Sequence, residues 1–137
     1  MADKIQFDLV SPERKLASVA ATEVRIPGAE GDLTAMAGHE PTILSIRPGV
    51  LTVNGDNGEE QFIVVGGFAE VAAGSVSVLA EMALPRGEMS QEVVTDLIAQ
   101  ATKTHEDAHP DEHHVTEKFL SDLVHVAEDM GFHSHLG

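Results

Sequence analysis

The sequence predicts an α+β protein in which an N-terminal antiparallel β-sandwich is followed by a C-terminal antiparallel helical hairpin. Two observations predict this class. Up to residue 84 the chain consists of short runs in which apolar and polar residues alternate, and glycine or proline separates one run from the next. After residue 89 the apolar residues recur every three or four positions instead. The first pattern is typical of half-buried strands, and the second of amphipathic helices.

The first predicted strand, residues 5–9, alternates strictly between apolar and polar side chains. The other runs predict strands at 16–20, 22–26, 33–37, 43–46, 50–53, 61–65, 68–71 and 76–79. The sequence NGDNG at 54–58 is a strong hairpin signal, and the glycine pair at 66–67 is expected to separate two strands. Closely spaced strands of this kind, about nine here, are typical of an antiparallel sandwich or barrel.

Glycine and proline are concentrated in residues 27–51, where they set tight backbone turns. Between them, two polar loops at 28–32 and 38–42 are expected to project from the strands. Loops held by a rigid scaffold often carry binding residues. This segment is therefore the first place to look for a functional site.

A change of composition predicts a sandwich domain over 1–84, a linker at 85–89, a helical hairpin over 90–131 and a loose tail at 132–137. Ser90 is a candidate N-cap, and the first helix is expected to fray near Thr104. Pro110 disfavours helix at the residue before it, so the second helix is expected to begin near Asp111 and to end before Gly131. The apolar stripes of the two helices are Val93, Val94, Leu97, Ile98 and Ala101, then Val115, Phe119, Leu123, Val126 and Met130.

The chain has 137 residues and a formal net charge of −15, which argues against binding to nucleic acid or to anionic lipid. It contains no cysteine, so disulfides, thiolate metal sites and a cysteine nucleophile are excluded. The sequence contains no apolar run of the ~20 residues that a membrane-spanning helix needs, and its first residues do not resemble a targeting peptide. We therefore expect any membrane association to occur through a partner.

Catalytic motifs are missing from the sequence: it holds neither a phosphate-binding G-x-x-x-x-G-K-[ST] nor a G-x-S-x-G nucleophile turn. An enzyme is the least favoured class, and no cofactor is expected. Histidine is concentrated in the tail, at positions 105, 109, 113, 114, 125, 133 and 135. We interpret these side chains as solvated polar residues, with adventitious metal binding and a functional metal site as the alternatives.

Three spaced motifs give a more specific indication. GAEGDL at 28–33, GHEPTILSIRPGVL at 38–51 and GGFAEVAAGSVSVLAE at 66–81 resemble the epsilon subunit of F-type ATP synthases, and the resemblance covers residues 10–81. It implies a flattened sandwich of about ten short strands. It also implies a non-catalytic rotor subunit of the central stalk, which couples rotation of the c-ring to ATP synthesis through the gamma subunit. We expect a peripheral position on the cytoplasmic face of a bacterial plasma membrane.

The resemblance also assigns site residues. The surface that meets gamma is expected to include His39, Glu40, Pro41, Thr42 and Ile43. The tip that meets the c-ring is expected to include Ala29, Glu30, Gly31 and Asp32. The alternatives are that the His39 ring only orders the turn before Pro41, and that Glu30 and Asp32 are ordinary solvated carboxylates. A free-standing sandwich that binds a small ligand or a peptide is the competing function.

The tail departs from the family. Some relatives bind ATP through a motif like [IL]-D-x-x-R-A, but residues 88–94 read EMSQEVV and lack both the Asp and the Arg. Residues 88–137 hold two lysines against eleven carboxylates, a formal charge of −9. Like charges repel at an interface, so contact with the acidic surface of the catalytic beta subunits is expected to be weak. We predict a tail that stays folded against the sandwich, inhibits hydrolysis weakly or not at all, and does not bind ATP.

Overall fold

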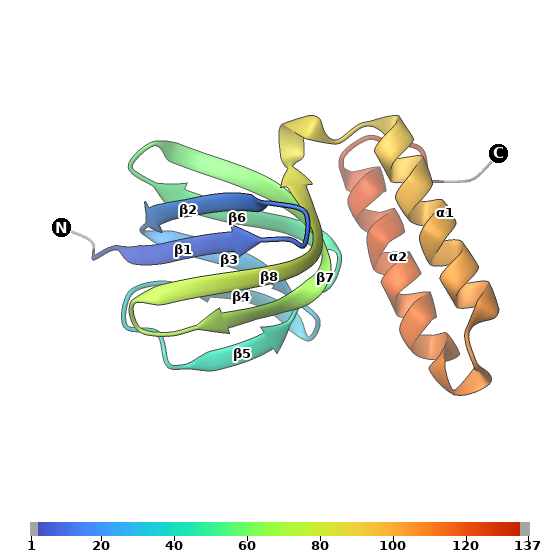
Figure 1. The fold of residues 1–137 in the computed structure, drawn as a ribbon, viewed down its shortest axis with the longest axis horizontal. Helices are drawn as coiled ribbons and strands as arrows, with labels where there is room; N and C mark the ends of the chain where they lie inside the picture. Colours follow the sequence, from blue (N-terminus) through green and yellow to red (C-terminus); the bar gives the residue numbers. More distant parts are fainter. Residues whose placement is uncertain (1–2, 135–137) are drawn as a thin grey trace. The chain divides into compact units, whose positions relative to one another are not determined.

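The computed structural model describes residues 3–134 and divides into two compact units, one ending at Gly87 and the other beginning at Glu88 (Figure 1). Strands make up the first unit and two helices make up the second, so the predicted α+β class is confirmed. The predicted linker at 85–89 contains the end of the last strand and a short 3₁₀ turn, η1 (Arg86–Glu88).

The described residues form eight strands rather than about ten: β1 (Ile5–Val10), β2 (Lys15–Ala21), β3 (Glu23–Gly28), β4 (Gly31–Ala35), β5 (Thr42–Ser45), β6 (Gly49–Gly55), β7 (Gly58–Val71) and β8 (Ser75–Pro85). Their order is β2-β1-β8-β7-β6-β3-β4, and β5 pairs with β7. All pairs are antiparallel except β1 and β8, which run parallel, so the purely antiparallel sandwich that we predicted is wrong at this one pair.

The expected break at Gly66 and Gly67 is wrong. Both glycines lie inside β7, which continues for 14 residues with φ of 77° at Gly66 and 110° at Gly67. At the glycines the alternation of inward and outward side chains shifts by one residue. Phe62 and Val64, at even positions, face the core before them, whereas Ala69 and Val71, at odd positions, face it after them. Since the alternation changes phase there, the sequence reads as two strands.

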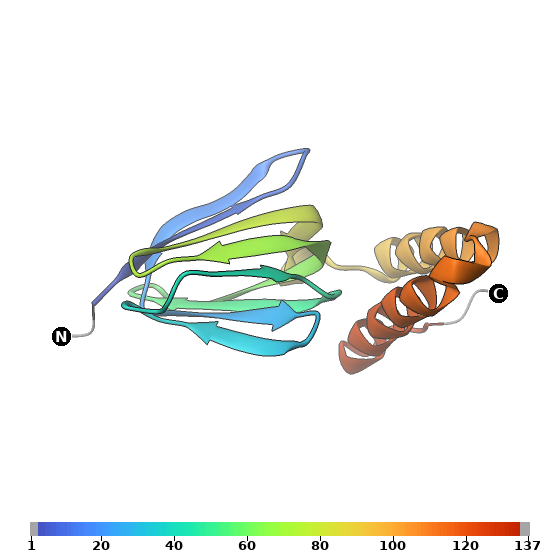
Figure 2. The ribbon, with the colours of Figure 1, turned by 90° about the horizontal axis from the view of Figure 1, so that it is seen from below.

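The long strand β7 connects two groups of strands. Its first half pairs with β6 and its second half with β5, while β8 pairs with residues 62–71. In Figure 2, β1 and β2 lie on one side of this hairpin and β3, β4 and β6 on the other. One apolar core joins the two sides, and Phe7 and Leu9 of β1 and Leu51 of β6 are completely buried in it. Each such side chain contributes about 1.5–3 kcal/mol of hydrophobic stabilisation.

The second unit contains α1 (Gln91–Asp107), a 3₁₀ turn η2 (Pro110–Glu112) and α2 (His113–Asp129). Ser90 caps α1 as predicted, because its hydroxyl accepts a hydrogen bond from the Val93 amide at 3.2 Å. The helix does not fray near Thr104 but continues to Asp107. It ends where Ala108 and His109 turn extended, as the following Pro110 requires.

Gly131 ends α2 as predicted. It has φ of 85°, its amide donates to the Glu128 carbonyl at 2.9 Å, and the Phe132 amide donates to the Ala127 carbonyl at 2.9 Å. This is the Schellman arrangement, which satisfies carbonyls left over at a helix end. Beyond it, His133 exchanges two hydrogen bonds with the Gln91 side chain. The predicted loose tail is thus held as far as residue 133, and residues 135–137 lie outside the described part.

Histidines organise the turn between the helices, which the sequence alone did not indicate. The Nδ1 atom of His105 lies 2.6 Å from the Thr116 hydroxyl, and the Nε2–H of His113 donates to the Ala108 carbonyl at 2.9 Å. The centroids of the His105 and His113 rings are 5.1 Å apart. These two side chains are therefore structural parts of the hairpin, contrary to the interpretation of the tail histidines as merely solvated.

The substitution Gly67→Ala should destabilise the sandwich. A Cβ at this position would lie 2.1 Å from the Leu79 carbonyl oxygen, on a backbone whose φ already disfavours L-residues. We expect the free energy of unfolding in urea to fall by at least about 3 kcal/mol. Gly74→Ala is the matched control, because no atom lies within 4 Å of its added Cβ. A loss below about 1 kcal/mol for Gly67→Ala would contradict this role.

A chain that ends after Gly87 should fold without the helices, because the strand pairs and the core cluster of the first unit lie entirely before that residue. The chain has no Trp or Tyr, so far-ultraviolet circular dichroism and amide dispersion in NMR spectra are the appropriate probes. We expect one cooperative transition in urea. Poorly dispersed amides with a gradual transition would show that the first unit needs the second.

Candidate functional site

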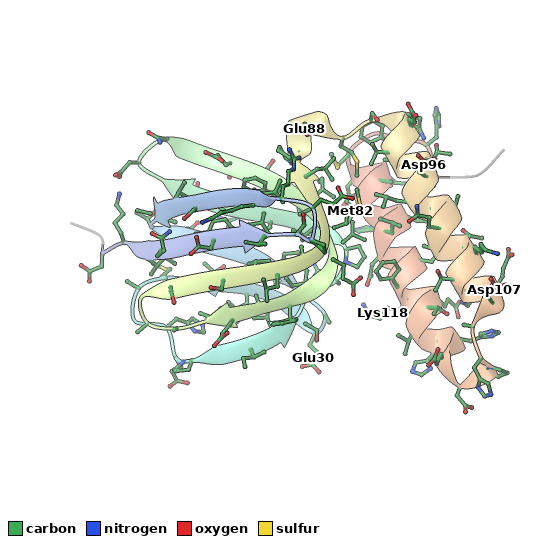
Figure 3. All side chains as sticks on the ribbon, viewed as in Figure 1. Glu30, Met82, Glu88, Asp96, Asp107 and Lys118 are labelled. Atoms are coloured by element: carbon green, nitrogen blue, oxygen red, sulfur yellow. The ribbon has the colours of Figure 1, made fainter. Side chains whose placement is uncertain are left out.

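The tip predicted to meet the c-ring is a tight hairpin between β3 and β4. Gly28 pairs with Gly31, so only Ala29 and Glu30 form the turn, and Asp32 already belongs to β4 opposite Pro27. A Cβ on Gly28 would lie 2.4 Å from the Gly31 carbonyl oxygen, and Gly31 has φ of 139°. The expected loop at 28–32 is thus a short, rigid turn that projects Glu30 from its end (Figure 3).

The segment predicted to meet gamma begins in the turn after β4. The Gly38 amide donates to the Ala73 carbonyl at 2.8 Å, which ties this turn to the loop before β8. The Glu40 carbonyl accepts hydrogen bonds from His39 Nδ1–H at 2.7 Å and from the Thr42 hydroxyl at 2.9 Å. His39 therefore orders the backbone directly before Pro41. This structural role was the alternative to a contact with the partner, and it does not exclude that contact.

The same segment then enters β5, where Ile43 is 74% exposed. On the outward face of the neighbouring strands, Phe68 of β7 is 46% exposed and pairs with Leu79 of β8, which is 48% exposed. Exposed apolar residues that gather on one face mark an interaction surface more strongly than single ones do. The sequence does not indicate that Phe68 and Leu79 face outward, because the change of phase at the glycines conceals which side of β7 faces solvent.

The two predicted site segments meet at one hollow. It has a volume of about 530 Å³ and is lined by residues 28–33 of the hairpin and 42–45 of β5. The backbone joins its two walls, since the Ala29 amide donates to the Ser45 carbonyl at 2.8 Å and Gly28 forms a β-bridge with Ile46. Segments that the resemblance assigned to different partners are thus neighbours, and a movement of one displaces the other.

Arg47 is the site residue that sequence reasoning missed. Its Nη1 donates to the Gly28 carbonyl at 2.6 Å, and its Nη2 contacts Asp32 Oδ1 at 2.6 Å. The signal was present in the sequence, because Arg47 is the only Lys or Arg between Arg25 and Arg86. A lone cation in an acidic, turn-rich segment is a candidate partner for a nearby carboxylate.

The predicted site offers groups that can bind a partner. It presents one imidazole, several carboxylates, the hydroxyls of Thr42 and Ser45, and apolar side chains. Within residues 3–134, no three His, Asp or Glu side chains stand close enough to hold a metal ion. No helix in the same part of the chain is long and apolar enough to cross a membrane.

The comparisons with known proteins agree with one another. A family model described as ATP synthase, Delta/Epsilon chain, beta-sandwich domain matches residues 4–86. The ATP synthase epsilon chain of Rhodobacter capsulatus is 53% identical, over 99% of this chain and 100% of its own length. The epsilon chain of Paracoccus denitrificans is 50% identical, over 100% of this chain and 93% of its own length.

Among solved structures, a chain in the Euglena gracilis mitochondrial ATP synthase, described as OSCP/F1/c-ring in rotational state 1, is similar to this one. The identity is 25% with a TM-score of 0.66, and the match covers 88% of this chain and 77% of that chain. The resemblance carried by the three sequence motifs is confirmed. This chain belongs to the ATP synthase epsilon chain family.

Proposed function

We propose that this chain is a non-catalytic rotor subunit in the central stalk of a proton-translocating F-type ATP synthase. In this role it couples rotation of the c-ring to ATP synthesis through the gamma subunit. The observation that carries the proposal is the match to epsilon chains along the full length of the chain, both units included. We place the subunit peripherally on the cytoplasmic face of a bacterial plasma membrane, where it is held only through the complex.

Mechanical stiffness supports a role in transmitting torque. A subunit between a rotating shaft and a ring must resist shear, and hydrogen-bonded strands around one core resist it better than loops do. Here the hairpin tip is bonded to the segment after β5, and the turn before β5 is bonded to the loop before β8. Both candidate contact segments are therefore fixed to the body of the sandwich.

We assign the gamma contact to residues 39–43 together with the apolar face formed by Ile43, Phe68 and Leu79. Burial of exposed apolar area drives association, and these three side chains supply it on adjacent strands. We assign the c-ring contact to the tip at residues 29–32, where Glu30 ends the hairpin. The apolar face and the charged tip differ in chemistry, which suits two different partners.

Single cysteines test these assignments cleanly, because the chain has none of its own. In the reconstituted rotor, we expect Glu30→Cys to cross-link to the c-ring and His39→Cys to cross-link to gamma. Asn57→Cys is the control: it lies in the β6–β7 turn, at the end of β3 opposite to the tip. The assignments are wrong if Glu30→Cys reaches only gamma and His39→Cys reaches neither partner. A chain that forms no stable complex with gamma would favour the free-standing binding module instead.

The helical unit is proposed to inhibit ATP hydrolysis weakly or not at all. Both of its lysines are paired within their own helices, Lys103 with Asp107 at 3.3 Å and Lys118 with Asp122 at 2.7 Å; Figure 3 labels Asp107 and Lys118. A contact with an acidic segment of a catalytic beta subunit would only exchange these exposed ion pairs for others, with little gain in free energy. The excess of carboxylates opposes such a contact further.

ATP hydrolysis by the reconstituted catalytic complex tests this proposal. At pH 8 we expect the full chain and the chain ending after Gly87 to give rates within about twofold of each other, a difference below about 0.5 kcal/mol. Strong inhibition at pH 8 that depends on the tail, or binding of ATP to the isolated subunit at micromolar concentration, would contradict the proposal.

A further inference from the structure

We infer that Arg47 is a positioning residue that fixes the tip of the β3–β4 hairpin, and that the two acidic residues there have different roles. Asp32 contacts Arg47 within the chain, and we call the contacts of the Arg47 side chain with Gly28 and Asp32 the bracket. Glu30, in contrast, is the carboxylate that contacts the partner. The inference rests on the proposed function for the identity of that partner. The bracket itself is a property of this chain and is tested separately.

Arg47 holds both strands of the hairpin. Its backbone amide donates to the Pro27 carbonyl at 2.9 Å, and its Nη1 donates to the Gly28 carbonyl at 2.6 Å, so two of its bonds reach β3. Its Nη2 reaches Asp32 of β4 at 2.6 Å. One residue beyond the hairpin thus fixes the spacing of its two strands next to the turn.

The end of β3 needs this support because its pairing with β6 stops before it is reached. The pairing between β3 and β6 ends at Arg25 and Thr52, so Pro27 and Gly28 have no partner from β6. Residues 46 and 47 take the place of that strand, through the Gly28–Ile46 bridge and the bonds of Arg47. Without the Arg47 side chain, the last residues of β3 keep only their backbone bonds, including that from the Arg47 amide to the Pro27 carbonyl.

A guanidinium is the group suited to this bracket. It is planar and presents several N–H donors in a fixed fork, so it can serve a carbonyl and a carboxylate at once. A lysine ammonium at the same place has its charge at one point on a flexible stem. The Arg47 side chain is 30% exposed and its bond to the Gly28 carbonyl is partly buried, whereas the Asp32 side chain is 72% exposed, so water competes more at the ion pair than at the carbonyl.

The two tip carboxylates therefore differ. Asp32 is in an ion pair with Arg47, while Glu30, among the described residues, makes no ion pair. Glu30 lies in the turn itself and is exposed, so its charge is uncompensated where the hairpin ends. A cationic side chain or an N–H donor on the c-ring loops is the chemistry that this carboxylate recognises.

Hydrogen exchange of the full chain tests the bracket without any partner. The Ala29 amide, which donates to the Ser45 carbonyl across the hollow, reports on the fixation of the tip. We expect Arg47→Met and Asp32→Asn to accelerate its exchange about tenfold, and Arg47→Lys less than that. Because Asp32 acts through its contact with Arg47, which Arg47→Met already removes, the double variant should exchange hardly faster than Arg47→Met alone. Arg25→Met is the matched control on the same strand, with no expected effect.

Binding of the full chain to the purified c-ring tests the different roles of the two carboxylates. Glu30→Gln should lower the affinity about tenfold and leave Ala29 exchange unchanged. Asp32→Asn should lower the affinity only together with faster exchange. If the Ala29 amide exchanges at an unchanged rate in both Arg47→Met and Asp32→Asn, the bracket is wrong. If Asp32→Asn lowers the affinity for the c-ring while Ala29 exchange is unchanged, Asp32 contacts the c-ring directly, and the different roles of the two carboxylates are wrong. If the unaltered chain does not bind the c-ring, the proposed function fails at this contact, while the exchange result still decides the bracket.

Discussion

The close approach of Gly67 to the backbone of β8 is the constraint on which the sandwich depends. It lets a single 14-residue strand pair with β6 in its first half and with β5 in its second half, while β8 pairs with residues 62–71. A side chain at this point would meet the Leu79 carbonyl and force the strands apart. Among the described strands, β5 pairs with β7 alone. The position of β5, and of the candidate gamma contact that it carries, therefore depends on this glycine.

The consequences reach the tip as well. The segment after β5 supplies Ile46 and Arg47, and these two residues hold the end of β3. A chain of contacts therefore runs from the β7–β8 hairpin through β5 to the turn that carries Glu30. Most of it consists of backbone hydrogen bonds, which do not lose stiffness through side-chain rotation. If the tip and the apolar face contact different partners, as proposed, such a path links the two contacts.

Much of this fold was predictable because its signals are local. Alternation located β1 and β3, the NGDNG sequence located the β6–β7 turn, and Ser90 and Gly131 marked helix ends through their own capping chemistry. The failures involve partners far apart in sequence. The parallel pairing of β1 with β8, the bonds from Arg47 to Gly28 and Asp32, and the exposure of Phe68 all depend on strands that come together only in the folded chain. The family motifs predict the site segments, but a motif cannot tell which of its side chains face inward.

The turn around Pro110 opposes a conformation in which α1 and α2 form one continuous helix instead of a hairpin. In that conformation, Ala108 and His109 must become helical and Pro110 must enter a helix interior, which costs about 3 kcal/mol. The same change breaks the contact between His105 and Thr116 and the bond from His113 to the Ala108 carbonyl, each contributing about 1 kcal/mol. These costs arise inside the hairpin, before any charge meets a partner. The excess of carboxylates along the two helices then adds repulsion to a conformation that the turn already disfavours.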